Sequence, residues 1–239
     1  MASGMTAPRR CPLCHGRGTR SHALVQGRRY HACAECGLIH MDPADRLDPE
    51  AERSHYGHHE NDPGDPRYRA FLDRLATPLA ERLEPGARGL DFGSGPGPAL
   101  STMLEERGFV VSDYDPFFAP GAAVLRQTFD FVAATETVEH FFDPRREFDL
   151  LDRLLRPGGL LGIMTQWRPP ARAFEQWRYA RDPTHVSFYG SETMEWIGRR
   201  YGWDVENLPR DVTIFRKSKD SEKTDGTPQR QRREVRERS

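Results

Sequence analysis

The sequence predicts an α/β protein with a doubly wound sheet and a small N-terminal module. A short apolar run ends at Asp91 and is followed by Gly93, Gly95 and Gly97, a pattern typical of a strand that turns into a helix around a ligand. Apolar strand segments then alternate with helical segments, which favours a parallel sheet covered by helices. All four cysteines lie within the first 36 residues. A chain of 239 residues can hold one substantial core and one such module.

The cysteines form two CxxC pairs that 18 residues separate: Cys11, Cys14, Cys33 and Cys36. Two such pairs predict a tetrahedral zinc site, in which four thiolates leave no coordination position for water or substrate. We therefore expect a structural zinc ribbon over residues 1–45, with short strands at 28–32 and 38–40. Two disulfides or four ordinary thiols are the alternative.

Residues 46–85 are expected to form a linker and a helix. From Arg67 onward, apolar residues recur at helical spacing until Pro85 and Gly86 end the pattern. The histidine-rich stretch 55–59 before this helix would form either a lid over a ligand or a solvated loop. It lacks the ordered spacing that the cysteines show.

The glycine turn departs from the dinucleotide-binding fingerprint. That fingerprint needs Gly or Ala three residues after its second glycine, where this chain has Pro98. A pyrophosphate ligand is therefore disfavoured. The next predicted strand, 110–114, is followed by Asp115, and an acid in this position can accept hydrogen bonds from ribose hydroxyls. Asp113 is the neighbouring candidate, but only Asp115 lies at the strand tip.

Four ordered motifs resemble those of the class I S-adenosylmethionine-dependent methyltransferases, and within them the ubiquinone-type O-methyltransferase group. Asp91 and the three glycines match the (D/E)xGxGxG pattern of the first motif, and Asp115 matches the acid after the second strand. FDFVAATETVEHFFDP, residues 129–144, has the register of the fourth-strand motif, and LRPGGLLGIMT, residues 155–165, matches the fifth-strand entry. The resemblance implies a Rossmann-like methyltransferase domain over 86–217 that ends in an antiparallel hairpin.

The resemblance also implies S-adenosylmethionine as the cofactor, held by the glycine turn and the ends of the next strands. The expected contacts are Asp91, Gly93, Ser94, Gly95, Gly97, Asp115 and Glu136. Asp91 would orient the glycine turn or the methionine ammonium group. Glu136 would contact the cofactor's amino group or form the pocket wall.

One segment departs from the family pattern. Only 14 residues lie between Asp115 and Asp130, too few for the usual helix, third strand and second helix. We therefore expect this edge of the sheet to be shortened. Phe117 or Phe118 would then offer an apolar surface to adenine, with core packing as the alternative.

Two histidines are candidates for the general base, because methyl transfer from a sulfonium needs a positioned nucleophile that often loses a proton. His140 follows the fourth-strand motif, and His185 lies between the fifth strand and the next helix. Asp182, three residues before His185, would fix its tautomer and raise its basicity. In the alternative interpretation His185 caps a turn and His140 hydrogen-bonds the backbone.

Residues 167–189 gather aromatic and arginine side chains: Trp167, Phe174, Trp177, Tyr179, Arg168, Arg172, Arg178 and Arg181. Aromatic faces beside guanidinium groups favour a small planar or anionic acceptor. Packing is the competing explanation, because Phe174 and Trp177 are three residues apart and would share one side of a short helix.

The C-terminal part is expected to form a helix over 191–201 with a serine cap at Ser191, and then strands at 203–208 and 211–216. Residues 218–239 have almost no apolar content and are expected to be disordered.

The overall composition favours no nucleic-acid or membrane partner. The formal net charge is −1, with 35 basic and 36 acidic side chains. No apolar run approaches the roughly 20 residues that span a bilayer, and the N-terminus lacks the apolar core of a signal peptide, so a cytoplasmic protein is expected. A small-molecule methyltransferase is the main prediction. An RNA methyltransferase that grips its substrate with the zinc ribbon, and a noncatalytic cofactor-binding module, remain the alternatives.

Overall fold

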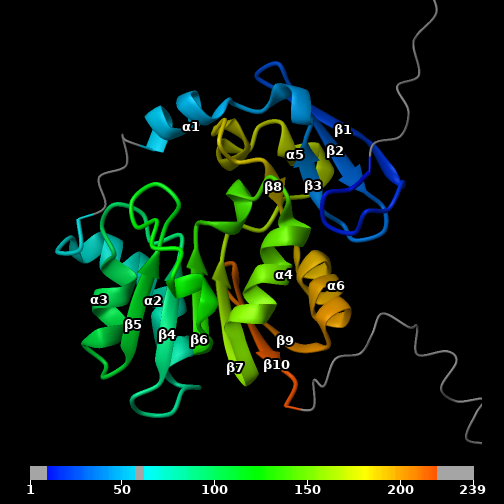
Figure 1. Cartoon of the computed structure of the whole chain (residues 1–239). Helices are drawn as coiled ribbons and strands as arrows, with labels where there is room; N and C mark the ends of the chain where they lie inside the picture. Colours follow the sequence, from blue (N-terminus) through cyan, green and yellow to red (C-terminus); the bar gives the residue numbers. More distant parts are fainter. Residues whose placement is uncertain (1–9, 57–61, 220–239) are drawn as a thin grey trace, which may run out of the picture.

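A computed structural model describes residues 10–56 and 62–219, and Figure 1 shows them as two sheets with surrounding helices. The main sheet has six strands in the order β5-β4-β6-β7-β10-β9. Its strands are β4 (Arg88–Phe92), β5 (Val110–Tyr114), β6 (Phe129–Thr135), β7 (Leu155–Met164), β9 (Trp203–Leu208) and β10 (Val212–Lys217). The first four run parallel, whereas β10 pairs antiparallel with both β7 and β9. The predicted Rossmann-like sheet with a terminal antiparallel hairpin is confirmed.

Helices cover both faces of this sheet. They are α2 (Pro66–Ala80), α3 (Ala99–Glu105), α4 (Pro144–Leu154) and α6 (Ser191–Tyr201). The apolar sides of α2 and α3 share one buried cluster with strand residues such as Phe131 and Ala133. Those of α4 and α6 share another with Val132 and Ala134. Because successive strand residues point to opposite faces, the apolar run of β6 serves both clusters.

The β5 edge of the sheet is short, as the spacing between Asp115 and Asp130 predicts. After β5 the chain forms an irregular loop and one 3₁₀ turn, η2 (Val124–Arg126), before it enters β6. No strand lies beyond β5 within the described residues.

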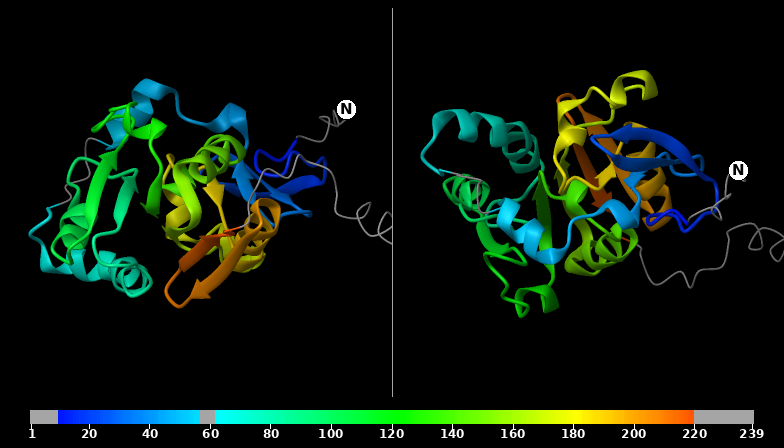
Figure 2. Two further views of the ribbon diagram at one scale, coloured as in Figure 1. Left: turned by 60° about the horizontal axis from the view of Figure 1, so that its bottom comes forward. Right: turned by 90° about the horizontal axis from the view of Figure 1, so that it is seen from above.

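The second sheet has four strands in the order β1-β2-β3-β8. They are β1 (Thr19–Val25), β2 (Arg28–Cys33), β3 (Ile39–Met41) and β8 (Ser187–Phe188). β2 and β3 lie within one residue of the predicted strands, whereas β1 was not predicted because its sequence lacks a clear alternation. β8 comes from the segment after β7 and pairs antiparallel with β3. The N-terminal module and this later segment therefore share one sheet, and both lie above the same half of the main sheet (Figure 2).

The cysteine-bearing end of this module packs against α4 and α6. Cys11, Leu13 and Leu38 belong to the buried cluster that α4 and α6 also line. On the α4 side, Arg145 donates hydrogen bonds to the carbonyl oxygens of Pro12 (3.3 Å) and Leu13 (3.1 Å). The module is thus anchored to the main domain through its core and through backbone contacts.

Short elements complete the connections. They are η1 (Pro43–Asp45), α1 (Pro49–Tyr56), η3 (Val138–His140), α5 (Ala171–Phe174) and η4 (Arg178–Arg181). The predicted serine cap of α6 is wrong: the cap residue is Gly190, whose N–H lies 3.4 Å from the Thr193 hydroxyl, and Ser191 is the first helical residue. No described helix is long and apolar enough to cross a membrane. Histidines 58 and 59 and most of the tail predicted to be disordered, residues 220–239, lie outside the described residues.

Candidate functional site

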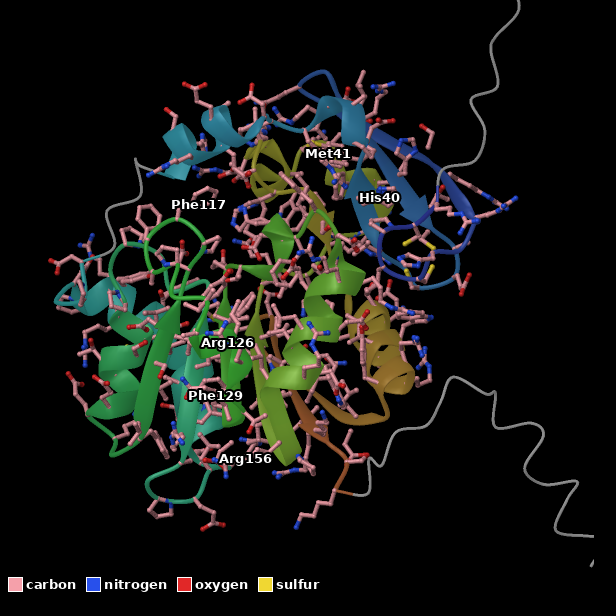
Figure 3. All side chains as sticks on the ribbon, viewed as in Figure 1. His40, Met41, Phe117, Arg126, Phe129 and Arg156 are labelled. Carbon is pink, nitrogen blue, oxygen red and sulfur yellow. The ribbon has the colours of Figure 1, made fainter. Side chains whose placement is uncertain are left out.

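A cavity of about 800 Å³ opens at the carboxyl ends of β4, β5 and β6. In open α/β sheets this end is where ligands bind, because the loops that follow the strands meet there. The glycine turn after β4 forms one wall, and the loop after β5, where Figure 3 labels Phe117, forms a second. Residues from α1 and from the segment before β8 line the opposite side.

The glycine turn has backbone angles and space that suit glycine. Gly93 and Gly95 have φ angles of +82° and +66°, in the left-handed region that side chains disfavour. A Cβ atom on Gly93 would lie 2.3 Å from Cγ2 of Thr137. Ser94 also lines the cavity, whereas Gly97 does not and instead leads into α3. The turn therefore brings bare main chain to the cavity at residues 93–95.

Asp115 lines the cavity at the tip of β5 and is 8% exposed. Its Oδ2 accepts a hydrogen bond from the N–H of Gly95 (3.1 Å), and its Oδ1 accepts from the N–H groups of Phe117 (2.8 Å) and Phe118 (3.0 Å). Asp113 instead accepts from the Ser101 hydroxyl and does not line the cavity. Asp115 thus joins the glycine turn to the loop after β5, and both phenylalanines of that loop line the cavity.

Asp91 lies at the end of β4, where it is almost fully buried. Burial, followed by the nearby Asp113 carboxylate, raises the pKa of Asp91 to about 7, against a smaller lowering by the Ser101 hydroxyl. This carboxyl group borders the cavity and would be more readily ionised next to a cationic ligand.

Glu136 follows β6 with a φ of +47°, an uncommon conformation for a residue with a side chain. Its N–H donates to the carbonyl oxygen of Met164 (2.8 Å), and its side chain lines the cavity. Burial and the Glu139 carboxylate raise the pKa of Glu136. A carboxyl group is therefore kept at this position despite an uncommon backbone conformation and a neighbouring carboxylate. Such a combination is frequent at functional sites.

His140, Asp182 and His185 meet on the side of the cavity opposite the glycine turn. The two imidazole rings lie 4.8 Å apart, and Nε2 of His185 lies 3.9 Å from Asp182. Burial lowers the pKa of His140 despite the nearby Glu139 carboxylate. Burial alone would raise the pKa of Asp182, but His185 and the Thr184 hydrogen bonds outweigh it and bring the pKa to about 2. The structure thus brings the three predicted catalytic residues together.

Of the aromatic residues of 167–189, Phe174, Trp177 and Tyr179 serve in packing, whereas Arg172, Arg178 and Arg181 are exposed. Phe174 is fully buried and packs against Tyr30 and Phe188 of the second sheet. Of the eight residues named for acceptor binding, only Tyr179 lines the cavity. The arginines that would bind a planar or anionic acceptor do not line the cavity, because residues 167–189 fold against the N-terminal module.

The cavity wall is strongly acidic. Its carboxyl groups are those of Glu52, Asp91, Asp115, Glu136, Asp143, Glu147 and Asp182, whereas Arg146 is the only lysine or arginine among the described lining residues. Such a wall favours a ligand with positive charge and disfavours an anion.

The four cysteines have the arrangement of a tetrahedral thiolate site. Their Sγ atoms all lie within 4.8 Å of one another, at 3.5 Å for Cys11 with Cys36 and for Cys14 with Cys33. Zinc–sulfur bonds of about 2.3 Å in a tetrahedron place sulfur atoms roughly 3.8 Å apart, so the donor set fits the metal. Figure 3 shows the sulfur atoms gathered at one end of the N-terminal module.

Several lining residues could not be predicted from the sequence, among them Glu52, Tyr68, Phe142 and Gln166. Glu52 reaches the cavity because α1 lies over it, and His55 of the same helix contacts Asp182 at 3.3 Å. The histidine-rich stretch therefore contacts the site through His55. No local sequence pattern indicates that the chain places α1 over the cavity.

A family model described as a methyltransferase domain matches residues 58–208. Among solved structures, a 1,6-didemethyltoxoflavin-N1-methyltransferase from Burkholderia thailandensis, crystallised with 1,6-didemethyltoxoflavin and S-adenosylhomocysteine, is 18% identical with a TM-score of 0.53. The match covers 83% of this chain and 99% of that one. A protein from Pyrococcus horikoshii is 17% identical, with a TM-score of 0.49 and coverage of 69% and 99%. At 18% identity the likeness to the Burkholderia enzyme shows the fold alone. No curated protein matches the chain significantly.

Proposed function

Because the chain belongs to the methyltransferase domain family, we propose that it transfers the methyl group of S-adenosylmethionine to a small-molecule acceptor. The observation that carries this proposal is the single cavity that joins the glycine turn at Gly93 to His140 and His185. The acidic wall suits a cofactor with a sulfonium and an ammonium group. The S-adenosylhomocysteine bound by the Burkholderia enzyme supports the same choice of cofactor.

In this proposal the cofactor lies against the main chain of residues 93–95. Asp115 faces its ribose, Asp91 and Glu136 face its positively charged end, and Phe117 and Phe118 cover its adenine. The acceptor lies beside His140 and His185. Its nucleophile forms a bond to the methyl carbon while the carbon–sulfur bond breaks and its electron pair stays on sulfur. Enzymes promote such a displacement chiefly by alignment.

The two histidines would receive the acceptor's proton. Nδ1 of His140 lies 3.1 Å from the Thr184 carbonyl oxygen, and Nδ1 of His185 lies 2.8 Å from that of Tyr179. Because a carbonyl oxygen only accepts, each neutral ring has its hydrogen on Nδ1 and its lone pair on Nε2. Asp182 would stabilise the charged form of His185.

The four thiolates of the N-terminal module are proposed to hold one structural zinc ion. Such an ion would fix the two loops that carry the cysteines, and through them the docking of the module on α4 and α6.

Calorimetric titration of the full chain with S-adenosylmethionine and S-adenosylhomocysteine tests the cofactor, with micromolar binding at one site expected. A radiolabelled methyl assay against a small-metabolite extract and against total RNA then tests the acceptor. Label in the extract supports the proposal, and label only in RNA would replace it with the RNA methyltransferase. Binding without label in either would indicate a noncatalytic module.

Replacing His140 or His185 with alanine should lower the methyl-transfer rate 10²- to 10⁴-fold, the usual contribution of a general base. Cofactor affinity should change less than threefold, because neither histidine is among the residues proposed to contact the cofactor. Initial rates at saturating cofactor and calorimetry measure the two quantities. Unchanged rates in both variants would remove the histidines from the reaction.

Affinity for S-adenosylmethionine should rise between pH 5.5 and pH 7 as Asp91 ionises, and further towards pH 9 as Glu136 ionises, because the pKa of Glu136 is raised to about 9. The pKa of Asp91 is raised to about 7, so binding a cation beside it releases a proton and the affinity gains up to about tenfold per pH unit below that value. In the unliganded protein, folding stability depends on pH in the opposite direction. The stabilising contribution of Asp91 is greatest below the ordinary pKa of an aspartate and declines as the pH rises to 7. The slope of affinity between pH 5.5 and pH 7 should largely disappear in Asp91→Asn, and a full slope that persists there would assign the effect in this range to another group.

A further inference from the structure

A second set of side chains with metal-ligand chemistry lies beside the cavity, which His140 and His185 line while Glu139 lies buried behind them. One carboxylate oxygen of Glu139 and one ring nitrogen each of His140 and His185 lie within 4.8 Å of one another. Oε1 of Glu139 lies 3.8 Å from Nε2 of His140. The three residues come from η3 and from the segment before β8, and the strand pairing between β3 and β8 holds that segment in place. The cluster is far along the chain from the cysteines and uses none of them.

Both rings are oriented as metal-binding histidines commonly are. In each ring Nδ1–H donates to a backbone carbonyl oxygen, of Thr184 for His140 and of Tyr179 for His185. These contacts fix the tautomer that presents the Nε2 lone pair, which is the usual outer-shell arrangement around an imidazole ligand.

Glu139 supplies a buried carboxyl group. It is 0% exposed, and its oxygens accept hydrogen bonds from the Thr165 hydroxyl (2.9 Å) and the Tyr179 hydroxyl (2.5 Å). Among the ion pairs of the described residues it contacts only His140. Buried carboxylates normally pair with a cation or coordinate a metal, because an isolated buried charge is costly. Asp182 also lines the cavity and adds further negative charge.

We propose that Glu139, His140 and His185 hold a divalent transition-metal cation, with Mn²⁺ as its probe, beside the acceptor. Two imidazoles and one carboxylate suit such ions, and three protein ligands leave coordination positions open to a substrate oxygen. The four-thiolate site differs in having no open position. The two sites would therefore hold different ions and serve different purposes.

The consequence for catalysis rests on the proposed function, whereas the ion site itself does not. A hydroxyl oxygen bound to the ion loses its proton more readily. The proton would pass to solvent, the oxygen would form its bond to the methyl carbon, and the electron pair of the broken carbon–sulfur bond would stay on sulfur. With the ion bound, both Nε2 lone pairs serve as ligands, so the histidines would activate the acceptor through the ion. Without the ion, they would act as the bases described above.

Manganese binding by the full-length, zinc-containing protein tests the site. Electron paramagnetic resonance counts bound Mn²⁺ during a titration, and elemental analysis counts zinc in the same samples. We expect one Mn²⁺ per chain in addition to the zinc. Glu139→Gln, which keeps the side-chain shape, and His185→Ala should weaken Mn²⁺ binding at least tenfold. His22→Ala, outside the cavity, serves as the matched control and should bind Mn²⁺ as the unchanged chain does. Thermal unfolding of each variant checks that it is folded.

The outcomes separate this inference from the proposed function. Absence of Mn²⁺ binding in the unchanged chain, or unchanged binding in Glu139→Gln, would overturn the ion site. S-adenosylhomocysteine affinity is measured in the same samples. Mn²⁺ binding without S-adenosylhomocysteine binding would support the ion site and contradict the proposed cofactor. S-adenosylhomocysteine binding without Mn²⁺ binding would support the cofactor and contradict the ion site. Broadening of the cofactor methyl proton signal by bound Mn²⁺ would place the ion beside the reacting carbon, and no broadening with both bound would contradict its position.

Discussion

Replacing Gly93 with alanine should lower the affinity for S-adenosylhomocysteine at least 100-fold. The φ of +82° strains any L side chain, and the added Cβ would lie 2.3 Å from Cγ2 and 2.5 Å from Oγ1 of Thr137. These are distances that real side chains do not adopt, so the turn or Thr137 must shift, and both border the cavity. A 100-fold loss corresponds to about 2.7 kcal/mol, which is within reach of a displaced main chain that forms one wall of the site. Calorimetry measures the change.

Gly108 offers a matched control for this substitution. Its φ is +88°, but a Cβ there would meet no atom within 4 Å. Gly108→Ala should therefore cost about 1–2 kcal/mol of stability through backbone strain alone and leave cofactor affinity unchanged. Equal affinities in Gly93→Ala and the unchanged chain would show that the glycine turn does not contact the cofactor.

The main sheet could be predicted closely because its signals are local. The apolar runs at 110–114 and 203–208 are strands with the expected bounds, and the short link from Asp115 to Asp130 correctly predicted the truncated edge. The acid at the tip of β5 was also predictable. Strand alternation points Asp113 and Asp115 the same way, and only Asp115 lies at the strand end. In each case the residues that form the sequence pattern are the same few residues that form the structural feature.

The acceptor side could not be predicted in the same way, because it is built from segments distant in the sequence. Ser187 and Phe188 form the strand β8 only because they pair with His40 and Ile39. This pairing holds the aromatic segment 167–189 against the second sheet. This pairing explains why the arginines of that segment lie away from the cavity. Glu139 was visible only as a motif position, and its burial between Thr165 and Tyr179 depends on the folded segment.

Replacing Cys33 with serine should reduce bound zinc from one ion per chain to nearly none and lower stability by at least 4 kcal/mol. Structural zinc in isolated peptides contributes roughly 10 kcal/mol, and here Cys33 and Cys36 also belong to the core that α4 and α6 line. For a chain of this size the loss corresponds to a fall of roughly 8–16 °C in Tm. Elemental analysis and calorimetric unfolding measure the two effects, and Leu24→Ala on the exposed β1 is the control that should change neither.

The same substitution should also lower methyl transfer more than it lowers cofactor affinity. Cys33 ends β2, β2 pairs with β3, and β3 pairs with β8, which begins two residues after His185. Loosening the module would therefore displace the acceptor side of the cavity, while the glycine turn at Gly93 belongs to the main sheet and would stay. Loss of the metal with full stability and full activity would contradict the structural role of the ion, and equal losses of rate and cofactor affinity would contradict the route through β8.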